Sequence, residues 1–197
     1  VTILNAGVIG AASHKGWRPV WVVSLLGSVL LIGGWLATGY DESLRWASLA
    51  FLAVNLLLFV GATVRGCLAT GEETGAVELT ILFVATTGFF LAGVYVLPSS
   101  PSLCRGLLAL GLGAGELLLG WGARRRAEEP SLLPDAAFGL GGALMVLACP
   151  LLLSGNPLTV AWAAEAVVLT HLGIRYRRET VSTAGWLVPA ASVVVLL

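Results

Sequence analysis

Residues 19–38, PVWVVSLLGSVLLIGGWLAT, form an apolar segment without a single charged side chain. An α-helix needs about 20 predominantly apolar residues to cross the hydrocarbon core of a bilayer, and this segment has that length. Pro19 opens it at a position where the N–H that proline lacks would have no partner within the helix. The sequence therefore predicts a transmembrane helix over residues 19–38.

Comparable apolar segments recur along the whole chain. The sequence is 57% hydrophobic and only 11% charged, whereas a soluble domain carries about 25% charged residues. Turn-forming residues such as Pro98 and the Asn156-Pro157 pair separate the segments. We predict an all-α fold, a polytopic transmembrane helical bundle of about eight spans. The spans cover residues 1–13, 19–38, 44–64, 76–97, 103–122, 134–153, 158–174 and 182–197.

Both ends of the chain lie in apolar runs. The sequence begins with Val1-Thr2-Ile3 rather than an initiator methionine, and it ends with Val195-Leu196-Leu197. We interpret the first and last spans as truncated and the chain as an internal fragment of a longer membrane protein. Residues 1–197 are then a single transmembrane helical domain. The formal net charge of zero gives no basic field that would attract nucleic acid.

Lysine and arginine are distributed unevenly between the predicted loops. Only Arg45 and Arg105 fall in the loops after even-numbered spans. The other nine basic residues follow odd-numbered spans: Lys15, Arg18, Arg65, Arg124, Arg125, Arg126, Arg175, Arg177 and Arg178. Cytoplasmic loops carry such an excess of positive charge, so we expect the basic loops to be cytoplasmic. The two arginine clusters, Arg124–126 and Arg175 with Arg177 and Arg178, either only set this topology or also bind anionic lipid headgroups.

A polar residue recurs at one depth in the odd-numbered spans, ten residues before a basic residue. The pairs are Asn5 with Lys15, Asn55 with Arg65, Glu116 with Arg126, and Glu165 with Arg175. Ten residues of helix rise about 15 Å, which places each polar group near the middle of the bilayer. The pattern predicts four repeated helical hairpins. Their odd helices would form an inner layer and their even helices a lipid-facing one.

Glu165 and Glu116 are the strongest candidates for a functional site. An ionisable group inside a membrane is costly, faces the protein interior and finds a partner. The two carboxyl groups would serve either as a proton or cation relay or as interhelical hydrogen-bonding groups. Asn55 and Asn5 present the same choice, with hydrogen bonding between helices favoured.

Other residue types indicate packing or nothing beyond topology. Gly111-x-x-x-Gly115 is a small-residue pattern that permits close helix approach. Cys104 and Cys149 have no metal-binding spacing, and the sequence leaves open whether they pair. His171 could ligate a haem or pigment, but the chain's other histidine lies in a predicted loop. We therefore predict no cofactor and no metal. No nucleotide-binding, metalloprotease or catalytic-triad motif is present, so we do not expect an enzyme.

Several stretches resemble a known family. NPLTVAWAAEA at residues 156–166, LGIRYRR at 172–178 and AGW at 184–186 are similar to a recurring segment of a large bacterial family of predicted membrane proteins. The segment from Gly16-Trp17-Arg18-Pro19 to Gly33-Gly34-Trp35 resembles another. The family is known only as a domain of unknown function, and its members are long, many-spanned and rich in Leu, Ala and Trp. The resemblance implies a location in the bacterial cytoplasmic (inner) membrane and no particular activity.

These features favour an integral membrane protein without catalytic activity. We expect a structural or accessory subunit that contacts membrane lipids and packs against other membrane proteins or the rest of its own chain. The alternative is a secondary transporter or ion-coupled permease that uses Glu116 and Glu165, because internal repeats and polar groups at the midplane are typical of transporter folds.

Overall fold

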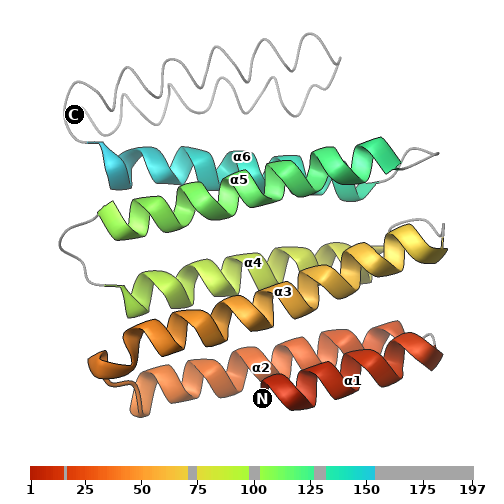
Figure 1. Ribbon diagram of the computed structural model, residues 1–197, viewed down its shortest axis with the longest axis horizontal. Helices are drawn as coiled ribbons and strands as arrows, with labels where there is room; N and C mark the ends of the chain where they lie inside the picture. Colours follow the sequence, from red (N-terminus) through yellow and green to blue (C-terminus); the bar gives the residue numbers. More distant parts are fainter. Residues whose placement is uncertain (16, 71–74, 98–102, 127–131, 154–197) are drawn as a thin grey trace, which may run out of the picture.

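A computed structural model of the chain describes residues 1–15, 17–70, 75–97, 103–126 and 132–153. This part is entirely helical and contains no strand, which confirms the predicted all-α class. It consists of six α-helices and one 3-10 turn, η1 (Glu42–Leu44). The α-helices are α1 (Thr2–Lys15), α2 (Arg18–Thr38), α3 (Arg45–Thr70), α4 (Ala76–Val96), α5 (Leu103–Arg126) and α6 (Leu132–Leu152) (Figure 1).

Five of these helices are long and apolar enough to cross a membrane. The spans are Pro19–Thr38, Glu42–Arg65, Ala76–Val96, Leu103–Arg126 and Leu132–Leu152, and α1 contributes a shorter apolar helix, Thr2–Ala12. Each lies within a few residues of a predicted span. The predicted spans 158–174 and 182–197 lie outside the described residues.

Two helices continue beyond the ends that hydropathy predicts. Helix α3 extends to Thr70 rather than to residue 64, and α5 extends to Arg126 rather than to residue 122. Arginine is a good helix former, so neither Arg65 nor the arginines of α5 end a helix. Hydropathy marks where an apolar segment stops, whereas the helix continues until turn-forming residues follow.

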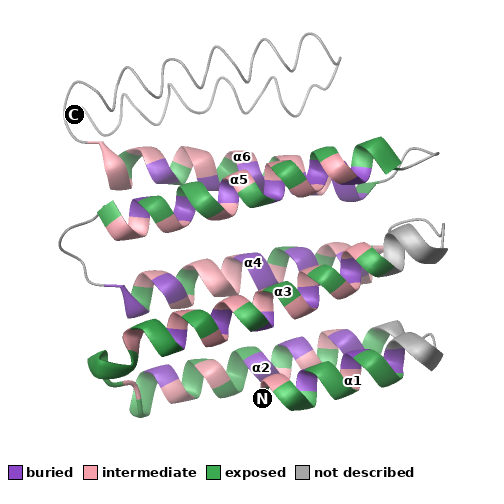
Figure 2. Cartoon of the chain, viewed as in Figure 1, coloured by how far each residue is buried: buried purple, intermediate pink, exposed green. Residues whose placement is uncertain are grey.

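The helices form two layers (Figure 1). Helices α1, α3 and α5 lie in the layer nearer the viewer, and α2, α4 and α6 lie behind them. Each odd helix packs against the even helix that follows it, with α5 and α6 in the most extensive contact, and α4 also contacts α2, α5 and α6. Buried residues occur on helices of both layers (Figure 2).

The predicted division into an inner odd layer and a lipid-facing even layer holds for only one of the three described even helices, α2, which has 22% of its apolar window buried. In the apolar windows of α4 and α6, 39% of residues are buried, against 28% in those of α3 and α5. Helix α4 is flanked by helices on several sides, so an even helix occupies the middle of the assembly. Polar residues on odd helices do not make those helices the more buried ones.

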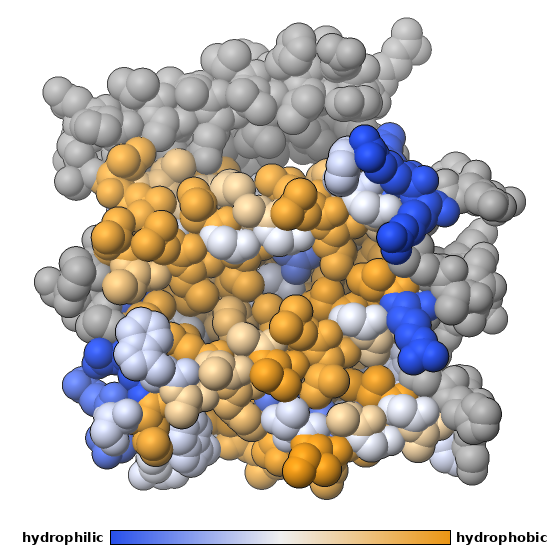
Figure 3. Space-filling model, in the orientation of Figure 1, coloured by the Kyte–Doolittle hydropathy of each residue, from blue (hydrophilic) through white to orange (hydrophobic). Residues whose placement is uncertain are grey.

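The outer surface matches a bilayer environment. Large apolar side chains are exposed along the spans, among them Leu30 (75%), Leu57 (69%) and Leu118 (67%). The space-filling view shows a broad apolar face, with hydrophilic side chains gathered towards the two ends of the helices (Figure 3). A surface of this kind is stable in hydrocarbon and would aggregate in water.

Aromatic and polar groups close one end of the assembly. The rings of Trp35 and Tyr95 each pack edge-to-face against the ring of Tyr40. The Tyr40 hydroxyl donates a 3.1 Å hydrogen bond to the carbonyl of Val96, which joins the end of α2 to the end of α4. Nearby in the chain, the Ser43 hydroxyl donates a 2.7 Å hydrogen bond to Asp41 and thereby lowers the pKa of that exposed carboxyl group.

Candidate functional site

The contact between α5 and α6 is a seam of small residues. The buried residues of α5 alternate in steps of three and four: Gly106, Ala109, Gly113, Glu116, Gly120 and Ala123. Such spacing places all of them on one helix face. A Cβ atom added at Gly113 would lie 3.0 Å from the carbonyl oxygen of Gly141, and one added at Gly141 would lie 2.9 Å from that of Gly113. The two backbones therefore meet directly here.

The glycine pair singled out in the sequence is not part of this seam. Gly111 and Gly115 are exposed, and a Cβ atom at either position would have no neighbour within 4 Å. The predicted close approach through Gly111-x-x-x-Gly115 is therefore wrong. Both glycines lie two residues from Gly113, on the opposite side of the helix, so the same helix packs through a different face.

Glu116 lies in the seam and reaches across to α4. Its side chain is 6% exposed, and its Oε1 accepts a 2.6 Å hydrogen bond from the hydroxyl of Thr86, which is fully buried. Its Oε2 is buried and has no hydrogen-bond partner among the described residues. The predicted burial of Glu116 and its partnership with a neighbouring helix are thus both present. The Oε2 atom can therefore accept a hydrogen bond from one further donor.

Asn5 is the centre of a second polar cluster, at the contact of α1, α2 and α3. Its side chain is 1% exposed. Its Nδ2 donates to Asn55 Oδ1 at 2.9 Å and to Ser28 Oγ at 2.7 Å. Its Oδ1 accepts a 2.9 Å hydrogen bond from the hydroxyl of Ser24. Asn5 thus binds both neighbouring helices.

Asn55 completes this cluster from α3. It is 5% exposed, and its Nδ2 donates to the Thr2 hydroxyl at 3.0 Å and to the carbonyl of Phe51, in its own helix, at 2.8 Å. Its Oδ1 accepts from Asn5. Both amide side chains of the cluster therefore have partners for donor and acceptor atoms alike.

The structure divides the predicted mid-membrane residues between separate sites. Asn5 and Asn55 meet, although 50 residues separate them in the chain, whereas Glu116 lies in a different interface with Thr86. Glu165 and His171 lie outside the described residues, so a relay that uses both glutamates stays a prediction. Among the residues that the structure describes, no group of three metal-ligating side chains occurs.

Sequence reasoning missed the hydroxyl partners. The mid-membrane pattern of Asn and Glu does not include the smaller hydroxyl residues Ser24, Ser28 and Thr86. A signal was available, because Ser24 and Ser28 are one helical turn apart and hence on one face of α2. Serine and threonine hydroxyls commonly hydrogen-bond across helices in membranes.

The basic cluster at the end of α5 is organised by an aromatic ring. The guanidinium carbon of Arg125 lies 3.6 Å from the ring centroid of Trp121, a cation–π contact. Trp121 is half-exposed, and Arg124, Arg125 and Arg126 are all exposed. Arg175, Arg177 and Arg178 lie outside the described residues. Cys104 and Cys149, whose pairing the sequence left open, do not form a disulfide.

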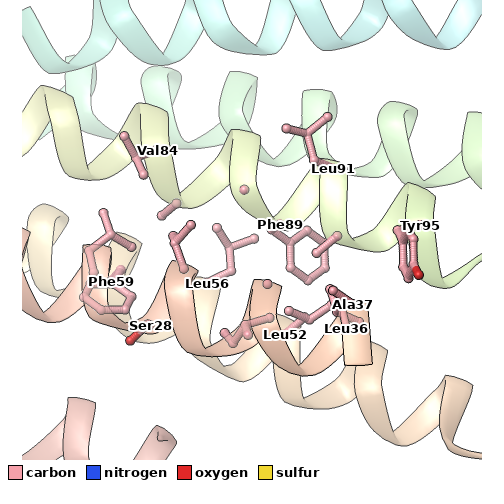
Figure 4. Close-up of a pocket in the computed structure, with 17 residues that line it drawn as sticks. Ser28, Leu36, Ala37, Leu52, Leu56, Phe59, Val84, Phe89, Leu91 and Tyr95 are labelled. Atoms are coloured by element: carbon pink, nitrogen blue, oxygen red, sulfur yellow. The ribbon is translucent and has the colours of Figure 1, made fainter. Parts of the chain in front are cut away.

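An apolar groove of about 380 Å³ runs between α2, α3 and α4 (Figure 4). Leu36, Leu52, Leu56 and Phe89 are among the side chains that line it, and Tyr95 lies at one of its ends (Figure 4). The carboxyl group of Glu116 and the amide groups of Asn5 and Asn55 do not line the groove. The groove thus offers space for hydrocarbon.

Comparison with known proteins identifies one family. A family model described as "Predicted membrane protein (DUF2339)" matches residues 1–197. No curated protein and no solved structure matches the chain. The family match covers the described helices and the remaining residues alike, and its description carries no activity.

Proposed function

We propose that this chain, which belongs to the DUF2339 family of predicted membrane proteins, is a non-catalytic membrane scaffold. In this proposal it has eight spans arranged as four repeated hairpins, and it lies in the bacterial inner membrane with its basic loops in the cytoplasm. It packs against other membrane subunits or against further parts of a longer chain. Its role is to hold helices at a fixed spacing rather than to transform a substrate.

The observation that carries this proposal is the saturation of the Asn5 cluster. Polar atoms of a transport or catalytic site must be available to a substrate. The amide groups of Asn5 and Asn55 are instead occupied by each other and by Ser28, Ser24 and Thr2. Interhelical hydrogen bonds of this kind hold membrane helices together. The most polar point of the N-terminal half thus joins α1, α2 and α3.

Co-purification tests the scaffold role directly. The protein carrying an affinity tag would be extracted in a mild detergent, and retained proteins identified by mass spectrometry. We expect other membrane proteins to be retained in a fixed stoichiometry. If the elements that pack against these helices belong to the same polypeptide, we expect that longer polypeptide alone. Retained partners should be lost on partial unfolding of the helices. Recovery of a lone protein with measurable solute flux would contradict the proposal.

Glu116 is the observation that favours a transporter, because its Oε2 has no described partner. We expect Glu116→Gln to leave the fold intact, since the amide oxygen can still accept from Thr86; the free energy of unfolding should change by less than about 1 kcal/mol. Proton flux into proteoliposomes, followed with a pH-sensitive dye, should be the same for both proteins. A proton-coupled flux that the wild type shows and the variant lacks would establish the transporter and overturn the scaffold.

The arginine cluster of α5 is proposed to bind anionic lipid headgroups. The Trp121 ring holds the Arg125 guanidinium at the end of the span, where phosphate groups lie, and each arginine near an anionic surface contributes about 1 kcal/mol. Replacing Arg124, Arg125 and Arg126 by Gln should reduce the preference for phosphatidylglycerol over phosphatidylcholine about tenfold or more. Lipid retention in nanodiscs of mixed composition measures this preference. Arg45→Gln is the matched control, and an unchanged preference in the triple variant would refute the site.

A further inference from the structure

The apolar groove lies wholly within candidate membrane spans. Its lining runs along α2 from Leu25 to Ala37, and the facing residues belong to α3 and α4. Twelve residues of helix correspond to a length of about 18 Å, more than half the thickness of the hydrocarbon core. The groove therefore follows the direction that a lipid chain takes in one leaflet.

Small residues on two helices create this space. The lining includes Gly33 and Ala37 of α2 and Gly88 and Ala92 of α4. A Cβ atom at Gly33 would have no neighbour within 4 Å, and one at Gly88 would meet only a methyl group of Val29 at 3.9 Å. At these two glycines the backbones of α2 and α4 do not approach each other closely. A methyl group could be added at either glycine without a clash, which distinguishes the groove from the tight seam of α5 and α6.

The size of the groove selects its occupant. The groove has a volume of about 380 Å³ over a length of about 18 Å, far less than the volume of a helix of that length. An α-helix with side chains is about 10–12 Å in diameter, so a helix from another subunit cannot enter. A single hydrocarbon chain is narrow enough and long enough to fill the space.

The chemistry of the lining agrees with this choice. Among the lining residues, only Ser28 and Tyr95 carry a hydroxyl group. The Ser28 Oγ accepts a hydrogen bond from Asn5 and donates one to the carbonyl of Ser24. The groove is open to the lipid-facing surface, where Leu91 is 61% exposed. Tyr95, at the end of the span, is an amphipathic ring of the kind that sits at the level of lipid headgroups.

We propose that the groove between α2, α3 and α4 is a binding site for one acyl chain of a membrane phospholipid. The chain lies along Gly33 and Gly88, and the glycerol and headgroup lie beside Tyr95. A bound chain would fill the groove and supply van der Waals contacts that α2 and α4 do not make with each other at Gly33 and Gly88.

A photoreactive lipid tests this site. The probe is phosphatidylcholine with a diazirine in one acyl chain, incorporated into nanodiscs with the full chain, and labelled peptides are mapped by mass spectrometry. We expect adducts concentrated on residues that line the groove. In the double variant Gly33→Leu with Gly88→Leu, where leucine side chains occupy the groove, labelling of those residues should fall about tenfold.

Gly34→Leu is the matched control. Gly34 neighbours Gly33, has no atom within 4 Å of a Cβ position and does not line the groove, so labelling should match that of the wild type. A monodisperse elution profile and unchanged helicity show that the double variant is folded. Equal labelling of the groove in the double variant and in the wild type would overturn the proposal. So would adducts spread evenly over the lipid-facing surface of the wild type.

Discussion

Replacing Gly141 by leucine is expected to force α5 and α6 apart and to lower the free energy of unfolding by about 3 kcal/mol or more. The first added carbon alone would lie 2.9 Å from the Gly113 carbonyl oxygen and 3.1 Å from the Leu117 backbone nitrogen. Backbone atoms cannot rotate away as a side chain can, so the helices must separate. Reversible unfolding of the protein in bicelles, followed by circular dichroism or steric trapping, measures the loss.

Gly142→Leu provides the control for this change. Gly142 is the next residue in α6, yet its Cβ position has no neighbour within 4 Å, and leucine has a better helix propensity than glycine. We expect this variant to be as stable as the wild type or slightly more so. If both variants lost the same stability, the close approach of the two backbones would be disproved.

Asn5→Leu is expected to cost roughly 2 kcal/mol in the same unfolding measurement. Interhelical hydrogen bonds in membranes average about 0.6 kcal/mol and reach about 1.7 kcal/mol, and Asn5 bonds to two helices. Leucine would also leave the Asn55 Oδ1 buried without its donor, which adds a desolvation cost. The control is Thr80→Val, because the exposed Thr80 hydroxyl bonds only within its own helix, and its effect should stay below about 0.5 kcal/mol.

A double-mutant cycle with Asn55→Leu isolates the bond between the two asparagines. Because each substitution removes the same 2.9 Å contact, the double variant should be more stable than the sum of the single effects predicts, by roughly 1 kcal/mol. Strict additivity would mean that the two side chains do not interact, and the cluster would then have no role in holding α1 against α3.

Much of the fold could be predicted from the sequence because a bilayer imposes a simple rule on composition. The segment 19–38 must be a helix of that length, since only a helix satisfies its backbone groups without water. The same reasoning identified each of the five long spans. The depth of Asn5, Asn55 and Glu116 also followed from the chain itself, as a fixed rise per residue from a basic anchor. All three residues are buried against neighbouring helices, and their depth in the bilayer stays a prediction.

The partners of these residues could not be predicted in the same way. Hydrophobic periodicity shows which face of a helix turns inward when the outside is water, but here lipid is as apolar as the core. Helices that are apolar all round carry no such signal. For this reason the pattern Gly111-x-x-x-Gly115 appeared equivalent to the true seam through Gly113, and Ser28 and Thr86 were not recognised as partners.

The sequence by itself determined that this protein lies in a membrane and the approximate lengths of its five long spans, and it predicts the depth of its polar groups. Each of these depends on composition or on distance along one helix. The tertiary structure decided that Asn5 meets Asn55, that Glu116 meets Thr86 instead, and that α2 and α4 leave a groove while α5 and α6 touch. Those outcomes depend on the rotation of each helix about its axis. Only the packing of several helices at once fixes that rotation.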